Sequence, residues 1–163
     1  MDRLWSPWRS EYIASAGDVD AGICVFCKLR DEPESDEANF VLHRASRNYV
    51  VLNRYPYISG HLLIVPYEHV GELDSAAKAT TDELMDLTKF CQTALREVYR
   101  PDGFNVGMNL GRSAGAGIAG HIHIHILPRW SGDTNFMTSI GETRVLAEDL
   151  ATTFAKLRAK FGE

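Results

Sequence analysis

The sequence predicts an α+β fold: an antiparallel sheet of about five strands, with one long helix and a C-terminal helix. Two observations support this fold class. Short apolar segments outnumber helical ones and mostly follow one another along the chain, which favours antiparallel pairing. Helical periodicity occurs near the middle of the chain and at its end. The 163 residues, 45% of them hydrophobic, suffice for one domain with a substantial core.

The chain begins with a segment that mixes aromatic and charged residues, and we expect it to form an arm. Its Trp5 and Trp8 are expected to pack on the domain's own surface or on a second subunit. The acidic stretch "RDEPESDEA" (30–38) is poor in apolar residues and predicts a surface loop. A single domain of residues 1–163 then has three parts: the N-terminal arm 1–22, the core 23–145 and the C-terminal helix 146–163.

Five segments have the length and composition of strands. "NFVLHRASRNYVVLN" predicts two strands around a short polar turn, and "HLLIVP" predicts a strand buried on both faces. "RYPYISG", between them, contains the proline and glycine of a turn. "FNVGMNL" precedes a glycine-rich loop, "GRSAGAGIAG", and the histidine row "HIHIHIL" follows that loop. The strands are expected at 39–43, 48–53, 61–66 and 104–110, and through the histidine row.

The clearest helix is expected at 81–99. Apolar residues recur there at steps of three and four, namely Leu84, Leu87, Cys91, Leu95 and Val98. Thr80 or Thr81 is expected to cap its start, acidic residues to fill its first turn, and "RPDG" to end it. Residues 144–161 have the pattern of a second amphipathic helix.

Charge and cysteine content exclude several classes of protein. A net charge of −5 argues against binding nucleic acid through a basic face. No stretch reaches the roughly 18 apolar residues of a membrane span, and the N-terminal segment has no apolar region of a signal peptide. Three cysteines do not make a disulfide framework. We expect a cytoplasmic protein with neither nucleic acid nor membrane as a partner.

His121, His123 and His125 stand at alternate positions, each followed by an isoleucine. Residues two apart on a strand point to the same face, so the imidazoles are expected on one face and the isoleucines on the core side. The outer two would be about 13 Å apart at the backbone, whereas metal–nitrogen bonds are about 2.0–2.1 Å. Three ligands to one metal would strain a straight strand, which disfavours a zinc hydrolase using the whole row. We expect the row to divide its functions.

Phosphoryl or nucleotidyl transfer is the chemistry that suits such a row. A neutral imidazole is a competent nucleophile near pH 7, and a neighbouring imidazole can hydrogen-bond the phosphate oxygens. The preceding loop, with Gly115, Gly117 and Gly120, could offer backbone N–H groups to a phosphate. The alternative is a surface strand on which histidine is incidental; the regular spacing directly after a glycine-rich loop disfavours it.

The motif "HIHIHIL" resembles that of the histidine triad (HIT) family at all positions. "VLNRYPYISGHLLIVP" is similar to the nucleotide-binding half of that family, and "GFNVGMNLGRSAGAGIAGHIHIHILPRWSGDTNFM" to its bacterial diadenosine polyphosphate phosphorylases or hydrolases. The resemblance covers most of residues 1–145 and implies a HIT-like fold and a homodimer. It implies cleavage of dinucleoside polyphosphates, such as diadenosine tetraphosphate, through a covalent nucleotidyl-histidine.

The resemblance also implies roles for single residues. His123 would attack the α-phosphorus, His125 would contact the transferred phosphate, and His61 would lie beside them. Nucleotide-binding residues would be Leu52 and Arg54 at the base, Asn53 at the ribose, and Asn109, Gly115 and Gly117 around the α-phosphate. Many family members carry Ser or Thr at the position of Gly117, so only a backbone contact is expected there.

Cys24 and Cys27 have the spacing of a zinc knuckle. The alternatives are a redox pair or two incidental cysteines; a thioredoxin-like pair prefers a helix start in a βαβ unit, which the sequence does not indicate. The metal-bearing members of the family imply His69 and His121 as the other two ligands. The zinc would be structural, with all four positions occupied by protein.

The segment "PRWSGDTNF", after the row, allows two interpretations. Arg129 could meet a phosphate, Trp130 could stack on a base, and Asp133 and Asn135 could bind ligand. Alternatively, the segment is a turn held by Gly132 and capped by Asp133, with Trp130 in packing. The chief functional alternatives to the dinucleoside polyphosphate enzyme are a nucleoside phosphoramidate hydrolase and a non-enzymatic nucleotide-binding protein.

Overall fold

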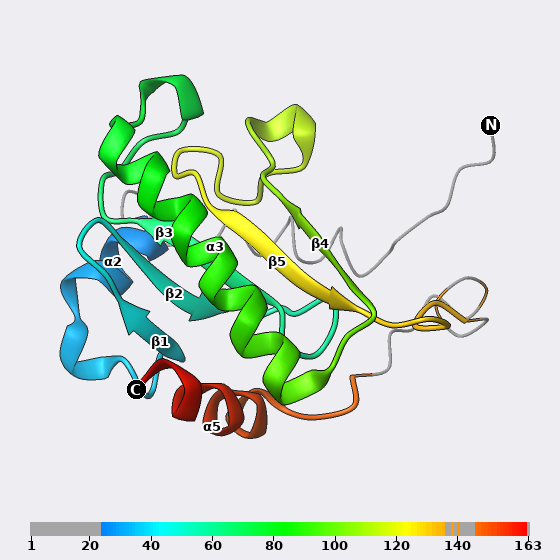
Figure 1. Ribbon diagram of the computed structural model, residues 1–163. Coiled ribbons are helices and arrows are strands. Elements are labelled where there is room, and N and C mark those ends of the chain that lie inside the picture. Colours follow the sequence, from blue (N-terminus) through cyan, green and yellow to red (C-terminus); the bar gives the residue numbers. More distant parts are fainter. Residues whose placement is uncertain (1–23, 136–137, 139, 141–145, 163) are drawn as a thin grey trace.

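The computed structural model describes residues 24–135, 138, 140 and 146–162, so the expected arm lies outside the described residues. The described part contains one antiparallel sheet with the strand order β1-β2-β3-β5-β4 (Figure 1). Its strands are β1 (Val41–Arg44), β2 (Asn48–Leu52), β3 (Leu62–Pro66), β4 (Gly103–Gly107) and β5 (Ile124–Arg129). The expected α+β class and five-stranded antiparallel sheet are therefore confirmed.

The helices form layers on both faces of this sheet. The long helix α3 (Lys78–Tyr99) lies along one face, and α5 (Leu150–Phe161) packs beside it and against β1 (Figure 1). The core between them contains the predicted helix positions and alternate strand residues: Leu42, Val50, Leu52, Leu62, Ile64, Leu84, Leu87, Cys91, Ala94, Leu95, Ile124, Ile126, Leu157 and Phe161. Burying this apolar surface supplies most of the driving force for folding.

The short helix α2 (Val25–Asp31) covers the opposite face of the sheet. Its Phe26 packs against Tyr49, Val51, Leu63 and Val65, which alternate with the residues that face α3. Both faces of β2 and β3 are thus covered, and all five residues of each strand are buried. The "HLLIVP" prediction of a strand buried on both faces is correct.

Strand β5 begins later than the histidine row suggests. Its paired residues start at Ile124, where Ile124 pairs with Ile64 and His125 with Leu63. His121 and His123 precede the strand because the chain there leaves β3: the N–H of Ile122 donates to the carbonyl of Val70, 2.8 Å away. The expectation of one regular strand through the row is wrong, although Ile124 and Ile126 do face the core under α3.

The boundaries of α3 also differ from the expectation. The helix begins at Lys78, with Ala77 as its N-cap, and neither Thr80 nor Thr81 caps it. The N–H of Ala77 instead donates to the Glu68 carboxylate, 3.0 Å away, so a distant residue replaces the local cap. No acidic residue lies in the first turn.

Three further boundaries differ from the expectation. The strand expected at 104–110 ends at Gly107, where its pairing with β5 stops. The C-terminal helix starts at Leu150 because the Asp149 side chain accepts a hydrogen bond from the N–H of Thr152, 2.7 Å away. The expected loop 30–38 includes the end of α2 and a short 3₁₀ helix, Pro33–Ser35.

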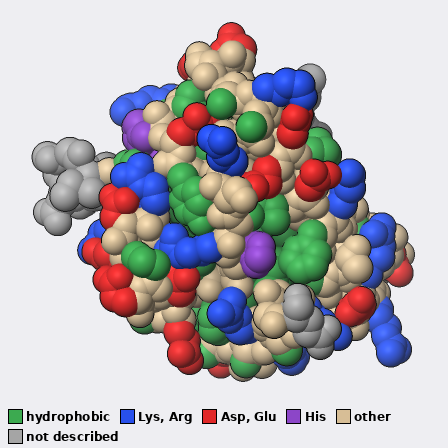
Figure 2. All heavy atoms as spheres, turned by 60° about the vertical axis from the view of Figure 1, so that its left-hand side comes forward, with side chains coloured by type: hydrophobic (Ala, Val, Ile, Leu, Met, Phe, Trp, Pro, Cys, Tyr) green, Lys and Arg blue, Asp and Glu red, His purple; other side chains and the backbone are tan. Residues whose placement is uncertain are grey.

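Acidic and basic side chains are interspersed over the surface seen in Figure 2, with hydrophobic patches between them. On this face no single sign of charge dominates, in keeping with the modest net charge of −5. None of the described helices combines the length and apolar content that crossing a bilayer requires.

The turn between β2 and β3 ends at Gly60, directly before His61. Gly60 has φ +79°, and a Cβ atom there would lie 3.1 Å from Leu95 Cδ2 and 3.2 Å from Pro128 Cγ. A left-handed backbone and close packing therefore both require glycine at this position. The turn is fixed against α3 and β5, and it holds His61 in place.

Gly60→Ala should therefore destabilise the fold by roughly 2–4 kcal/mol, the sum of backbone strain and overpacking. Gly132→Ala is the matched control, since Gly132 has φ +82° with open space around its Cα. It should cost only about 1–2 kcal/mol, the strain alone. Urea unfolding of both variants measures the difference, and equal losses would contradict the packing argument.

Candidate functional site

A pocket of about 270 Å³ opens between α2 and the ends of β2 and β5. Its walls are mostly apolar, and two imidazoles lie at one side. The residues that line it are Val25, Phe26, Leu29, Asn39, Phe40, Val51, Leu52, Asn53, Arg54, Tyr55, Leu63, Ile118, His123 and His125. An apolar pocket with a few polar groups is typical of a small-molecule site.

The ring of His123 is oriented by the main chain. Its Nδ1 lies 3.0 Å from the carbonyl oxygen of His121, and a carbonyl can only accept, so Nδ1 carries the proton. The lone pair is then on Nε2. Burial lowers the pKa of His123, which keeps the ring neutral near pH 7. A buried, neutral imidazole with a fixed lone pair is a suitable nucleophile.

His61 and His125 are joined by a second set of hydrogen bonds. The backbone N–H of Tyr57 donates to Nδ1 of His61 over 3.2 Å, so the proton of neutral His61 is on Nε2. That Nε2 lies 2.9 Å from Nδ1 of His125 and donates to it. The proton of neutral His125 is therefore on its own Nε2.

The Nε2–H of His125 is buried and has no hydrogen-bond partner among the described residues. Burial, with a smaller effect of His123, lowers the pKa of His125 to about 4. An unpartnered buried donor is costly, and an anionic oxygen would satisfy it. The rings of His123 and His125 are 4.8 Å apart, so one phosphate group could meet both.

The nucleotide-binding residues suggested by the sequence are only partly brought together. Leu52, Asn53 and Arg54 line the pocket beside the imidazoles, but Asn109, Gly115 and Gly117 are not among its lining residues. Within "GRSAGAGIAG" the lining residue is Ile118. The Asn53 side chain is engaged in the turn: its amide nitrogen lies 3.3 Å from Nδ1 of His61, and its oxygen accepts from the N–H of Tyr55.

The four candidate metal ligands converge at the far end of the row. One ligand atom from each of Cys24, Cys27, His69 and His121 lies within 4.8 Å of the others. Nδ1 of His121 is 3.3 Å from Sγ of Cys24 and 3.8 Å from Sγ of Cys27, and Nδ1 of His69 is 3.2 Å from Sγ of Cys27. Tetrahedral zinc with ordinary bond lengths separates sulfur from nitrogen by about 3.6 Å. The residues present fit such an ion.

The tautomer of His121 also suits a metal. Its Nε2 donates to the carbonyl of Pro66, 2.9 Å away, which leaves the lone pair of Nδ1 facing the two thiols. Cys24 is the N-cap of α2, so the pair does lie at a helix start, contrary to the expectation. A redox pair is nevertheless disfavoured, because burial and the neighbouring Cys24 raise the pKa of Cys27, whereas reactive thiols have lowered pKa values.

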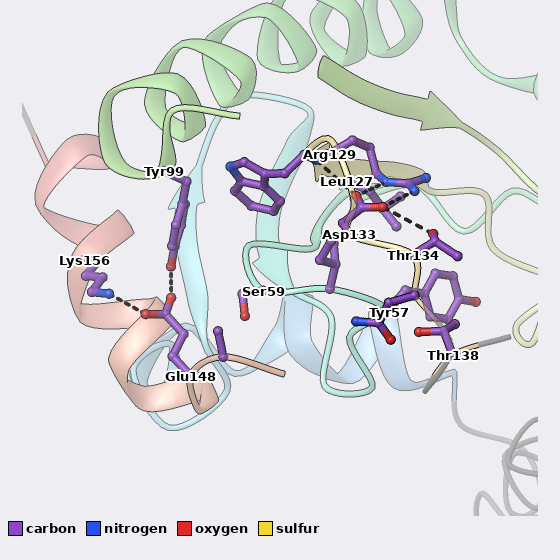
Figure 3. Close-up of a pocket in the computed structure, with 14 residues that line it drawn as sticks. Tyr57, Ser59, Tyr99, Leu127, Arg129, Asp133, Thr134, Thr138, Glu148 and Lys156 are labelled. Carbon is purple, nitrogen blue, oxygen red and sulfur yellow. Dashed lines mark hydrogen bonds and ion pairs between the residues drawn. The ribbon is translucent and has the colours of Figure 1, made fainter. Parts of the chain in front are cut away.

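A second cavity, of about 540 Å³, has Tyr57, Leu127 and Arg129 among its lining residues (Figure 3). Arg129, two positions beyond Leu127 on β5, forms a paired ion contact of 2.6 Å with Asp133. The Asp133 carboxylate also accepts from the N–H of Trp130, and Gly132 has φ +82°. These contacts support the interpretation of "PRWSGDTNF" as a capped turn. Contacts of Arg129 and Trp130 with a ligand stay a prediction.

Several residues that shape the site could not be predicted from the sequence. Val25, Phe26 and Leu29 form one pocket wall at helical spacing, a signal present in "VFCKL" but too short to predict a helix. The backbone N–H of Tyr57 left no signal, because any residue supplies that group. The ring of His43 lies beside those of Phe90 and Phe161, with centroids 6.0 and 6.1 Å away, and is not among the residues of either site.

The lowered pKa of His125 predicts acid sensitivity. Because its folded-state value of about 4 lies below the ordinary 6.5, the unfolded state binds more protons between these pH values, and stability falls as the pH falls through this window. His125 should account for about 2 kcal/mol of the stability lost between pH 7 and pH 5. Urea titrations at both pH values should show a loss smaller by that amount in His125→Gln. The same loss in wild type and variant would refute the assignment.

Comparison with known proteins places this geometry in a family. The model of the HIT domain matches residues 34–132. The chain is 42% identical over 157 residues to an AP-4-A phosphorylase of Mycobacterium tuberculosis, covering 94% of this chain and 80% of that protein. It is 27% identical over 93 residues to an asymmetrical bis(5'-nucleosyl)-tetraphosphatase of Schizosaccharomyces pombe, covering 57% and 50% of the two chains.

The fold has close structural relatives as well. A zinc-bound histidine triad family protein from Mycobacterium smegmatis superposes with a TM-score of 0.68 at 25% identity, covering 85% of this chain and 93% of that one. The family match includes the histidine row, the turn that carries His61, and strands β1–β5. By these similarities the chain belongs to the HIT family.

Proposed function

We propose that this protein is an enzyme that cleaves dinucleoside polyphosphates such as diadenosine tetraphosphate through a nucleotidyl-histidine intermediate. The observation that carries the proposal is the pair of imidazoles at the pocket: an acceptor nitrogen on His123 beside a donor on His125. The similarity to an AP-4-A phosphorylase over 94% of the chain supports the same activity and favours phosphate as the acceptor.

In the first step, Nε2 of His123 attacks the α-phosphorus. A phosphorus–nitrogen bond forms, the bond to the bridging oxygen breaks, and the rest of the substrate leaves as a nucleoside polyphosphate. The Nδ1–H of His123 remains bonded to the His121 carbonyl and stabilises the positive charge that develops on the ring. The Nε2–H of His125 bonds to an oxygen of the phosphate being transferred.

In the second step, an oxygen of phosphate or water attacks the same phosphorus, and the bond to His123 breaks. Phosphate gives ADP plus ATP from diadenosine tetraphosphate, and water gives AMP plus ATP. The chain Tyr57–His61–His125 holds the donor proton in place through both steps, because each ring nitrogen in it already has its role fixed.

The apolar pocket would take the base of the retained nucleotide, between Leu52 and the wall formed by α2. Asn53 would contact the ribose of that nucleotide, and Arg54 would lie at the rim of the pocket. Asn109, Gly115 and Gly117 would contact the α-phosphate. The second cavity is suited to the leaving nucleoside. Its cations are balanced by acids, Arg129 by Asp133 and Lys156 by Glu148, which favours an uncharged ring over phosphate.

The Cys24, Cys27, His69 and His121 cluster would hold one structural zinc ion. A bound zinc would tie α2 to the start of the histidine row, and with four protein ligands it would leave no position for substrate. We expect a cytoplasmic homodimer. The edge strand β4, with Val106 46% exposed, is suited to meet a second copy.

The test is a product assay on diadenosine tetraphosphate with and without phosphate. ADP plus ATP should form only when phosphate is present, and His123→Ala should lower turnover at least about 10³-fold, because the variant lacks the imidazole that forms the intermediate. AMP binding should stay within a few-fold of wild type.

Products without phosphate would change the acceptor to water. Turnover retained by His123→Ala would refute the nucleophile. Absence of any reaction would favour nucleoside phosphoramidates, which use the same nucleophile, and they are the second substrate to assay. AMP binding without either activity would support the non-enzymatic alternative.

Metal analysis tests the cluster independently. The purified protein should carry about one zinc per chain, and Cys24→Ser should lose it, since a hydroxyl is a poor replacement for a thiolate ligand. Cys91→Ser is the control, because Cys91 lies on the buried face of α3 and is not among the clustered ligands. Zinc retained by Cys24→Ser would exclude the four-ligand site.

A further inference from the structure

One side chain belongs to the surroundings of both sites. Phe26 lies between the two cysteines of the candidate metal cluster, and its ring also lines the nucleotide pocket. The ring centroid is 5.4 Å from that of His121, in an edge-on arrangement, and 4.9 Å from that of His123. The same ring therefore touches a candidate metal ligand and the candidate nucleophile.

Phe26 is rigidly held in this position. It is 4% exposed, and it packs on the sheet among the apolar side chains of β2 and β3. Its carbonyl accepts a hydrogen bond of 2.9 Å from the hydroxyl of Tyr49, which is itself fully buried. The ring has little room to move without moving the imidazoles, because interiors are close-packed.

The helix around Phe26 is short, so its position depends on contacts with the rest of the protein. It has seven residues, too few to be stable alone; Cys24 is its N-cap and Cys27 lies in its first turn. Its C-terminal carbonyls are held by Arg44, which donates to the carbonyls of Leu29 and Arg30. Arg30 donates in turn to the carbonyl of Tyr67. At the N-terminal end, Cys24 and Val25 pack against the apolar cluster around Phe26, and the side-chain hydrogen bonds are those among the candidate ligands.

We propose that Phe26 is a positioning residue that couples metal binding to nucleotide binding. An ion held by Cys24 and Cys27 would fix the first turn of α2 and with it the ring of Phe26. By packing against His123, this ring would hold the imidazole in the orientation needed for attack, and it would complete the pocket wall. This inference rests on the proposed function. A bound metal, although remote from the reacting atoms, would then raise the affinity for nucleotide. Because coupling between two ligands is reciprocal, bound nucleotide would in turn slow the release of the metal.

The experiment measures AMP affinity by calorimetry in the zinc-loaded protein and after removal of zinc by a chelator. In wild type, zinc removal should weaken AMP binding about 10-fold, within the range usual for coupled sites. In Phe26→Ala, removal of zinc should change the dissociation constant of AMP by less than about two-fold. Saturating AMP should slow zinc transfer to a chromogenic chelator in wild type by a factor of several, and not in Phe26→Ala.

Leu29→Ala is the matched control, because Leu29 lies on the same helix and lines the same pocket without a ring contact to either imidazole. Its AMP affinity should fall while the zinc-dependent ratio stays near that of wild type. Phe26→Leu serves in place of Phe26→Ala if the latter does not retain the circular dichroism spectrum of wild type. An unchanged ratio in the Phe26 variants would show that coupling runs through the His121 backbone, and would overturn the proposal.

A second measurement keeps this inference separate from the proposed function. If zinc-loaded wild type binds no AMP, the proposed function fails, and the coupling is then read from the NMR resonance of the His123 ring at one fixed pH. Zinc removal should shift that resonance in wild type, and by less than half as much in Phe26→Leu. Equal shifts, or a wild-type protein that binds no zinc, would overturn the coupling.

Discussion

The chemistry of this molecule depends on main-chain groups that decide which nitrogen of each imidazole carries a proton. The carbonyl of Pro66 fixes His121, and the carbonyl of His121 fixes His123. The N–H of Tyr57 fixes His61, and through it His125. As a result, His121 offers a lone pair to the thiols, His123 offers a lone pair at the pocket, and His125 offers a hydrogen-bond donor beside it. Backbone atoms are well suited to this function because the sheet and its turns hold them rigidly.

Strand β5 and the segment before it arrange these functions along one face of the sheet. The candidate metal cluster lies at one end, the two pocket imidazoles follow, and Leu127 and Arg129 reach the second cavity. The opposite face supplies the core under α3, so the sheet is a rigid base for the site. Because one strand face carries residues of all three sites, the main further element that the pocket and the metal cluster require is α2, which supplies the two cysteines and one wall of the pocket.

Much of the fold was predictable because it depends on periodicity. The apolar alternation of β2 and β3 and the helical spacing of α3 are local properties of the sequence, and the structure confirms them. The errors lie at boundaries. Helix α3 starts earlier because Glu68 caps it from outside, and β5 starts later because Val70 takes the N–H of Ile122. Both partners are supplied by the tertiary fold and have no signature near the boundary itself.

The sequence by itself determined the chemical inventory: the spacing of the histidines, the CxxC, and the order of motifs that marks the HIT family. Tertiary structure decided how that inventory is divided. It brought His69 to the cysteines and His61 to His125, and it placed Phe26 against two imidazoles at once. These contacts join residues far apart in the chain, and proton positions depend on distances of a few ångströms. Spacing along a sequence cannot specify these long-range contacts or the proton positions, because both arise only when the two faces of the sheet are packed.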